Sequence, residues 1–153
     1  MRIGGNDHVG NPGDRPDAAT KTAVLEQQGP TMTDARYDIE TDEVMFAAGE
    51  RFDVTAIGAA QTPWWNRTLC AVNDAWVRLG VMEGDFHWHK HDGEDEFFLV
   101  LEGQLDIELE DRIVELKPGN AFTVPAGVMH FPHARGRSVV LMIEKAGVVP
   151  TGD

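Results

Sequence analysis

A succession of short apolar runs, four to eight residues long, constrains the fold of this chain more than any other feature. Gly, Pro, Asn and Asp separate most of them, which is the pattern of short strands joined by turns. The expected strands are 67–72, 75–82, 86–91, 96–102, 104–109, 113–116, 121–124 and 138–144. Residues 44–59 could form a strand pair or a short helix with a strand. No helix of ordinary length is required, so the sequence predicts an all-β barrel or sandwich.

One of these runs, Glu96-Phe-Phe-Leu-Val-Leu-Glu, has apolar residues at both its odd-numbered and its even-numbered positions. Phe98 and Val100 share one face of a strand, and Phe97, Leu99 and Leu101 share the other. Both faces are therefore expected to be buried. A small barrel buries only its inner face, so the outer one needs cover from the chain's own N-terminal strands or from a second subunit. The sequence favours a homodimer, with the chain's own cover as the alternative.

The first 43 residues differ from the remainder. They are polar, carry repeated Gly and Pro, and show no sustained apolar period. Such a stretch buries too little surface to offset the entropy of ordering it. We expect a flexible N-terminal tail or arm over 1–43 and a single β domain over 44–153.

The charge balance limits the partners. The chain of 153 residues has 26 acidic and 13 basic residues, a formal net charge of −13. Binding of nucleic acid requires a basic protein surface, and anionic membranes attract basic proteins. Neither kind of partner is therefore expected. No apolar run is long enough to span a bilayer. The single cysteine, Cys70, and an N-terminus without an apolar signal segment favour a cytoplasmic protein.

The segment 87–97, His-Trp-His-Lys-His-Asp-Gly-Glu-Asp-Glu-Phe, holds three histidines and four acidic residues. Side chains two positions apart share a face of an extended strand, so His87, His89 and His91 should point the same way. Imidazole and carboxylate groups on one rigid face are typical ligands of a transition metal. The segment therefore predicts a metal site, with His130 as a distant partner.

Two motifs resemble those of the cupin superfamily. The first is similar to G-x5-H-x-H-x(3–4)-E-x6-G: His89-Lys-His91 is followed by four residues, Glu96, six residues and Gly103. Its opening glycine is displaced, because Gly84 lies four residues, not five, before His89.

The second motif is similar to G-x5-P-x-G-x2-H-x3-N. It runs from Gly119 through Pro125 and Gly127 to His130, and Ala134 stands where the family has asparagine. Fifteen residues separate Gly103 from Gly119, as in compact bacterial members. The resemblance covers about 67–145, and Pro125 and Gly127 are suited to a turn that presents His130.

The resemblance implies a double-stranded β-helix, or jelly-roll barrel, with His89, His91, Glu96 and His130 around one metal inside it. Three imidazoles and one carboxylate suit Fe(II), Mn, Ni, Cu or Zn, and ligand type does not choose among them. If His87 and His89 were the motif pair, with Glu94 as its carboxylate, Gly103 would lie two residues farther along the chain than the motif places its glycine. His87, Glu94 and His133 are therefore candidates for an outer shell, with His133 expected on a loop or rim and not as a ligand.

Other residues are assigned structural roles. Trp64 and Trp65 could stack on a cofactor, but packing at a barrel end or interface is the preferred interpretation. Cys70 is expected to be an inert buried thiol. There is no nucleophile elbow, phosphate loop or Cys-x-x-Cys pair.

The leading functional hypothesis is a metal-dependent cupin enzyme that binds a small metal-chelating metabolite in an apolar pocket. Its reaction would be of the dioxygenase, isomerase or cyclase type. A sugar phosphate is disfavoured, because the predicted strands offer few cations for a phosphate. The alternatives are a non-catalytic cupin that binds metal or a small ligand, as a sensor or storage module, and a structural dimer with a vestigial site.

Overall fold

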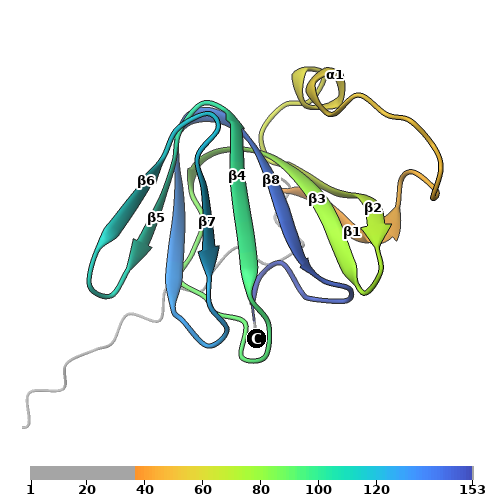
Figure 1. Cartoon of the computed structure of the whole chain (residues 1–153). Helices are drawn as coiled ribbons and strands as arrows, with labels where there is room; N and C mark the ends of the chain where they lie inside the picture. The colour runs from red at the N-terminus through yellow and green to blue at the C-terminus, as the bar shows by residue number, and fades with distance from the viewer. Residues whose placement is uncertain (1–36, 153) are drawn as a thin grey trace, which may run out of the picture.

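The structure, a computed structural model, describes residues 37–152. It contains one short helix and eight strands in this range, joined into one sheet that curls on itself (Figure 1). The elements are β1 Asp38–Val44, α1 Val54–Ala59, β2 Trp65–Val72, β3 Ala75–Asp85, β4 Glu96–Glu102, β5 Leu105–Leu109, β6 Ile113–Leu116, β7 Ala121–Val124 and β8 His130–Lys145. The expected jelly-roll architecture is confirmed.

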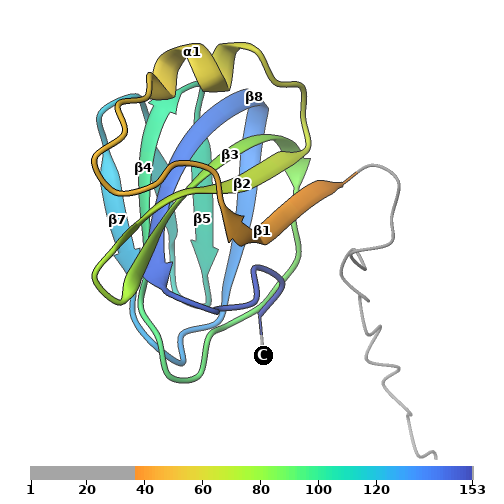
Figure 2. The same ribbon diagram turned by 90° about the vertical axis from the view of Figure 1, so that its right-hand side faces the viewer.

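Strand β8 joins the two halves of this sheet. The strand order is β1-β2-β3-β8-β4-β7, and β5 pairs with both β8 and β6. The first residues of β8 pair with β5, from His130 opposite Leu109 to Ala134 opposite Leu105. Its later residues run between β3 and β4 (Figure 2). Both halves of the barrel therefore take their positions from a single strand, whose first residue is His130.

Gly136 lies inside β8, although the sequence predicted a turn there and a strand that begins only at residue 138. The pairing of β8 with β3 skips residues at this point, from Met82 opposite Ser138 to Gly84 opposite Ala134. Gly136 has φ +84°. A glycine in the left-handed region is suited to a β-bulge, which bends a strand without ending it. The expected turn is thus a bulge that lets β8 bend from one half of the barrel to the other.

The segment 86–91 is not the strand that the sequence predicted. It forms one isolated bridge, in which the backbone groups of His89 and His130 exchange hydrogen bonds of 3.0 and 2.9 Å. Pro132 lies two residues further along β8 and has no N–H to continue the ladder on this side. The segment stays extended, so the predicted alternation persists: His87, His89 and His91 are buried while Trp88 is exposed.

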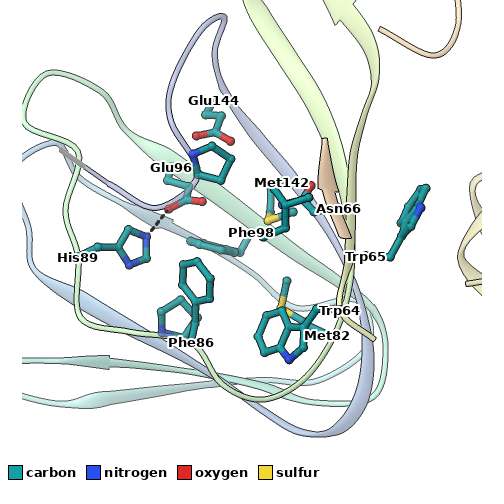
Figure 3. Close-up of a pocket in the computed structure, with 13 residues that line it drawn as sticks. Trp64, Trp65, Asn66, Met82, Phe86, His89, Glu96, Phe98, Met142 and Glu144 are labelled. Carbon is teal, nitrogen blue, oxygen red and sulfur yellow. Dashed lines mark ion pairs between the residues drawn. The ribbon is translucent and has the colours of Figure 1, made fainter. Parts of the chain in front are cut away.

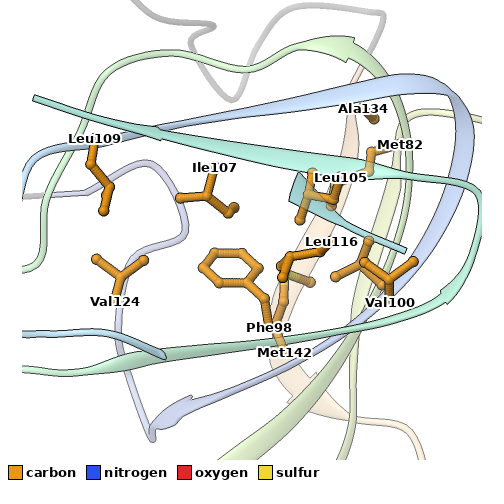
Figure 4. Packing of buried hydrophobic residues seen from close by; sticks show 11 residues of the cluster. Met82, Phe98, Val100, Leu105, Ile107, Leu109, Leu116, Val124, Ala134 and Met142 are labelled. Carbon is orange, nitrogen blue, oxygen red and sulfur yellow. The ribbon is translucent and has the colours of Figure 1, made fainter. Parts of the chain in front are cut away.

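The barrel interior is packed with the inward-facing residues of β3, β4, β5, β6, β7 and β8 (Figure 4). Phe98 and Val100 of β4 are buried in it. A second cluster around Leu79 and Val139 lies on the other face of the sheet. The helix α1 covers part of that cluster, and Asp53 caps the helix by accepting a hydrogen bond from the Ala56 amide. The chain therefore supplies some of its own outer cover.

The outer face of β4 differs from the expectation that it would be fully buried. Phe97 and Leu99 are half-buried, and Leu101 is 37% exposed. The cover from α1 reaches β3 and β8 but leaves these side chains partly open. A homodimer through this face stays a prediction.

The N-terminal boundary also differs from the expectation. Residues 38–44 were placed almost entirely in the flexible tail, but they form β1, which pairs in parallel with β2. Arg67 of β2 donates to the backbone oxygen of Asp38 and pairs with its carboxylate. Residues 1–36 of the predicted tail lie outside the described residues, and the single domain over 44–153 stays a prediction.

Gly103 allows a close backbone crossing at the end of β4. It has φ +82°, and a Cβ there would lie 2.5 Å from the Arg137 carbonyl oxygen and 2.4 Å from Ser138 Oγ. Gly119 has nearly the same φ, +84°, but no atom within 4 Å of its Cβ position. Both glycines belong to the motifs, yet only Gly103 is packed against another strand.

We predict that Gly103→Ala destabilises the protein more than Gly119→Ala does. Both substitutions place alanine in the left-handed region, at about 1–2 kcal/mol each. Gly103→Ala adds a clash with backbone, and overpacking of this kind costs about 1–3 kcal/mol more. Urea unfolding of the two variants measures the difference. Equal losses would contradict the close crossing.

Candidate metal centre

Four side chains that are distant in sequence meet at one point inside the barrel. His89 and His91 come from the extended segment before β4, and Glu96 and His130 are the first residues of β4 and β8. One ligand atom from each lies within 4.8 Å of the others. All four residues are buried, and none is more than 6% exposed. The structure thus brings together the four residues that the sequence predicted as ligands.

The backbone fixes how these side chains approach each other. The bridge between His89 and His130 places the two rings on adjacent chains, with centroids 4.1 Å apart. The His91 carbonyl accepts a 2.7 Å hydrogen bond from the Gly127 amide. The turn at Pro125 and Gly127 is therefore tied to the histidine segment, as well as leading into His130.

A single carboxylate oxygen is the centre of the cluster. Glu96 Oε2 lies 3.1 Å from His130 Nε2, 3.4 Å from His91 Nε2 and 3.9 Å from His89 Nε2. Three imidazole nitrogens of the same type thus face one oxygen from different directions. This arrangement places one carboxylate and three Nε2 atoms around a common point.

The tautomers of His89 and His130 follow from the hydrogen bonds that their Nδ1 atoms make. His89 Nδ1 lies 3.0 Å from the His87 carbonyl oxygen, and His130 Nδ1 lies 3.0 Å from the Val128 carbonyl oxygen. A carbonyl oxygen can only accept, so each Nδ1 carries the proton and donates it. In a neutral ring Nε2 then has a lone pair, which is the form that binds metals. The Nε2 atom of each ring faces the Glu96 carboxylate.

Charge makes this arrangement incomplete without a cation. Burial lowers the pKa of His89 to about 4, so this ring is neutral at neutral pH. Burial alone would raise the pKa of Glu96, but hydrogen bonding with His130 and His91 outweighs it and lowers the pKa to about 2. An ionised carboxylate facing imidazole lone pairs needs positive charge between them. Either a second proton on a ring or a metal ion supplies it.

An apolar pocket adjoins the cluster (Figure 3). Glu96 and His89 form part of its wall, and aromatic and thioether side chains form most of the remainder. The apolar lining includes Trp64, Met82, Phe86, Phe98, Pro132 and Met142. The space that the centre of a water molecule can reach is about 40 Å³. Since about 10–15 Å³ holds one water, the pocket admits a small molecule only.

A second carboxylate, Glu144 of β8, lines the same pocket. It is 4% exposed and forms an ion pair with Arg78 of β3, which is 1% exposed. Burial raises the pKa of Glu144 to about 7, and the negative charge of Glu96 acts in the same direction. The pocket therefore holds two carboxylates in different environments, one among imidazoles and one beside a guanidinium.

The three residues expected in an outer shell lie in different places. His87 is buried, its ring centroid is 5.0 Å from that of His89, and its Nε2 donates to the Thr151 carbonyl oxygen at 2.8 Å. Glu94 pairs with Lys145 at 3.5 Å, and His133 pairs with Asp85. Of the three, only His87 touches a residue of the four-residue cluster.

The sequence analysis did not identify the pocket residues outside the motifs. Arg78, which the sequence analysis did not single out, lies within β3 and is buried. The alternation of side chains along β8 could have identified Glu144. It shares a face of the strand with Val140 and Met142, which both face the interior. The two tryptophans both line the pocket, but Trp64 packs against the barrel interior and Trp65 packs in the second cluster.

Comparisons with known proteins agree with this geometry. The sequence profile of the Cupin domain matches residues 75–144. A cupin-2 domain containing protein from Shewanella frigidimarina is 32% identical, with a TM-score of 0.59, and the match covers 61% of this chain and 93% of that one. The chain belongs to the cupin family.

Other relatives extend the comparison without adding a function. This cupin is 39% identical over 80 residues to the uncharacterized protein YdbB of Bacillus subtilis, which covers 52% of this chain and 71% of that one. Protein NMB1881 from Neisseria meningitidis is 22% identical with a TM-score of 0.57, over 63% of this chain and 99% of its own. The second match supports the fold alone. Within residues 37–152 of this cupin, no helix is long and apolar enough to cross a membrane.

Proposed function

We propose that this cupin binds one divalent transition metal through His89, His91, Glu96 and His130, and acts as a metal-dependent enzyme on a small organic metabolite. The observation that carries the proposal is the approach of three imidazole Nε2 atoms to one buried, ionised carboxylate oxygen. A buried carboxylate surrounded by imidazoles is costly unless positive charge lies among them, and a bound metal ion would supply that charge. The three-histidine, one-carboxylate set suits Fe(II), Mn, Ni, Cu or Zn.

The chain's own residues prepare this site before a ligand enters. The carbonyl oxygens of His87 and Val128 hold the rings of His89 and His130 in the metal-binding tautomer. The aromatic walls exclude bulk water from the side of the cluster that faces the pocket. When bound, the metal would supply Lewis-acid polarisation, or activation of water or dioxygen. Trp64, Phe86 and Phe98 would orient the apolar part of the substrate.

The substrate class follows from the pocket. A compact molecule with a chelating group, such as an enol, a diketone, a hydroxy acid or a small catechol, could approach the metal with one end and the apolar wall with the other. Dioxygenation, isomerisation and cyclisation are the reaction types that such chelation supports. A phosphate group is disfavoured, because no Arg or Lys lines this pocket among the described residues.

A non-catalytic function, in which the cupin binds metal or a small ligand as a sensor or storage module, is the second candidate. The observation that favours it is the limited free space of about 40 Å³ beside the cluster. A site that admits only a few water molecules can hold a metal and a very small ligand without turnover. Turnover assays separate this function from the first.

The proposed assembly and cellular setting rest on other observations. The half-buried outer face of β4, with Phe97 and Leu99, supports a homodimer in which a second copy covers it. The lone cysteine of the chain, Cys70, supports a cytoplasmic setting. Net charge −13 continues to disfavour nucleic acid and anionic membrane partners.

We predict that His130→Ala lowers metal affinity at least about a hundredfold, because it removes one of four ligands. His133→Ala is the matched control: it removes a histidine three positions along the same strand that pairs with Asp85 outside the cluster. The measurement is metal content per chain after reconstitution with Mn, Fe(II), Ni, Cu or Zn and exchange against a weak chelator. Full occupancy in His130→Ala would show that the ligand assignment is wrong.

We predict that the Fe(II)-loaded protein consumes dioxygen with at least one compact diketone, catechol or hydroxy acid, and that His130→Ala does not. An oxygen electrode and product analysis by mass spectrometry provide the measurement. Stoichiometric metal without oxygen consumption, isomerisation or cyclisation across such a panel would leave the binding function as the better account.

A further inference from the structure

Glu144 of β8 lies directly opposite Glu96, the central carboxylate of the cluster, on the neighbouring strand β4. Phe97 of β4 pairs with Ile143 of antiparallel β8, so the next positions outward, Glu96 and Glu144, stand opposite each other on the inner face. Figure 3 shows both carboxylates toward one end of the pocket, away from Trp64 and Met82. A ligand that reaches the cluster through this pocket therefore passes beside Glu144.

Arg78 holds Glu144 by one oxygen only. Arg78 Nη1 donates to Glu144 Oε1, and Arg78 Nη2 donates to the Val148 carbonyl oxygen at 2.7 Å. The other oxygen, Glu144 Oε2, is buried and has no hydrogen-bond partner within residues 37–152. The side chain is thus fixed in place while one acceptor atom stays available in the pocket.

A second open acceptor lies in the same pocket. Asn66 of β2 also lines it, and Asn66 Oδ1 is buried without a hydrogen-bond partner in the described part of the chain. A buried acceptor without a donor is unfavourable, and proteins rarely keep two in one cavity unless something satisfies them. Since an ionised Glu144 and the Asn66 amide oxygen both accept at these atoms, the complementary ligand donates.

We propose that Glu144, positioned by Arg78, is a specificity-determining residue that accepts a hydrogen bond from the ligand bound at the metal. The ligand class is a compact metal chelator that carries a hydroxyl or N–H donor on the side away from its chelating atoms. This inference rests on the proposed metal site. It adds to that proposal a polar recognition group that the motifs do not contain.

The competing account is a purely structural ion pair between β3 and β8. Such a pair needs no free oxygen facing a cavity, and apolar residues of similar volume often serve the same packing role. A structural pair also predicts no dependence of ligand affinity on a donor group. Ligand selectivity therefore separates the two accounts.

The test uses three probes on the full-length, Co(II)-loaded protein at one pH well above 7, where Glu144 is ionised. Glycerate and lactate both chelate through a carboxylate and the 2-hydroxyl, but only glycerate has a further hydroxyl donor. 2-Hydroxy-3-methoxypropanoate keeps that oxygen and lacks its proton. Calorimetry and the visible Co(II) spectrum give the affinities. We expect glycerate to bind at least about tenfold more tightly than the other two, since a carboxylate oxygen accepts its hydroxyl.

The variant is Arg78→Met with Glu144→Met, which removes both charges and leaves neither unpaired in the interior. We expect it to retain Co(II) and to bind glycerate and lactate equally. The matched control is Arg137→Met with Glu102→Met, an ion pair of 3.0 Å outside the pocket, which should keep the preference for glycerate. If the double Met variant does not fold, as judged by circular dichroism, the comparison of the three probes on the wild-type protein decides.

The outcomes distinguish this inference from the metal proposal. A wild-type protein that holds Co(II) but binds all three probes equally, or binds none of them, overturns the role of Glu144 and leaves the metal site standing. Tight binding of the methoxy compound also overturns it, because that probe lacks the 3-hydroxyl donor. A protein that takes up no Co(II) or other transition metal overturns the metal site, and the inference with it.

Discussion

The structure of this cupin depends on one buried contact, the approach of three imidazole nitrogens to a single carboxylate oxygen of Glu96. Each of these side chains is costly to bury alone, and together they place three Nε2 atoms around a negative charge that needs positive charge beside it. Backbone carbonyls fix the tautomers of His89 and His130, so rotation of the rings does not relieve the conflict. A divalent cation does relieve it, and for that reason we regard the cluster as a prepared metal site.

The fold provides the rigidity that such a contact needs. Strand β8 belongs to both halves of the barrel, so its first residue, His130, is positioned by β5 as well as by the histidine segment. The bulge at Gly136 lets the same strand continue to Glu144, which lines the pocket beside Glu96. One strand therefore carries both a proposed metal ligand and the proposed ligand-contacting carboxylate, and it couples their positions.

Much of this arrangement could be predicted from residue types and spacing. The alternation of side chains along 87–91 correctly placed three histidines on one face, because the segment is extended even though it is not a strand. The motif spacing brought Glu96 and His130 to the same point. The absence of regular strand pairing in 86–91 was harder to predict. It depends on Pro132, which belongs to another strand and lies opposite this segment. The short helix over 54–59 was left open against a strand pair, because its cap Asp53 is local but its packing on Val139 involves a distant residue.

The pair of Arg78 and Glu144 could not be predicted from sequence, because the two residues are 66 positions apart and neither belongs to a motif. Only the register of β3 and β8 places them together. X-ray absorption spectroscopy of the metal-loaded protein tests the central claim most directly. Our account predicts three imidazole nitrogens and at least one carboxylate oxygen around the metal, at about 2.0–2.2 Å for Zn. A first shell made of oxygen atoms alone, or one with a single imidazole, would contradict it.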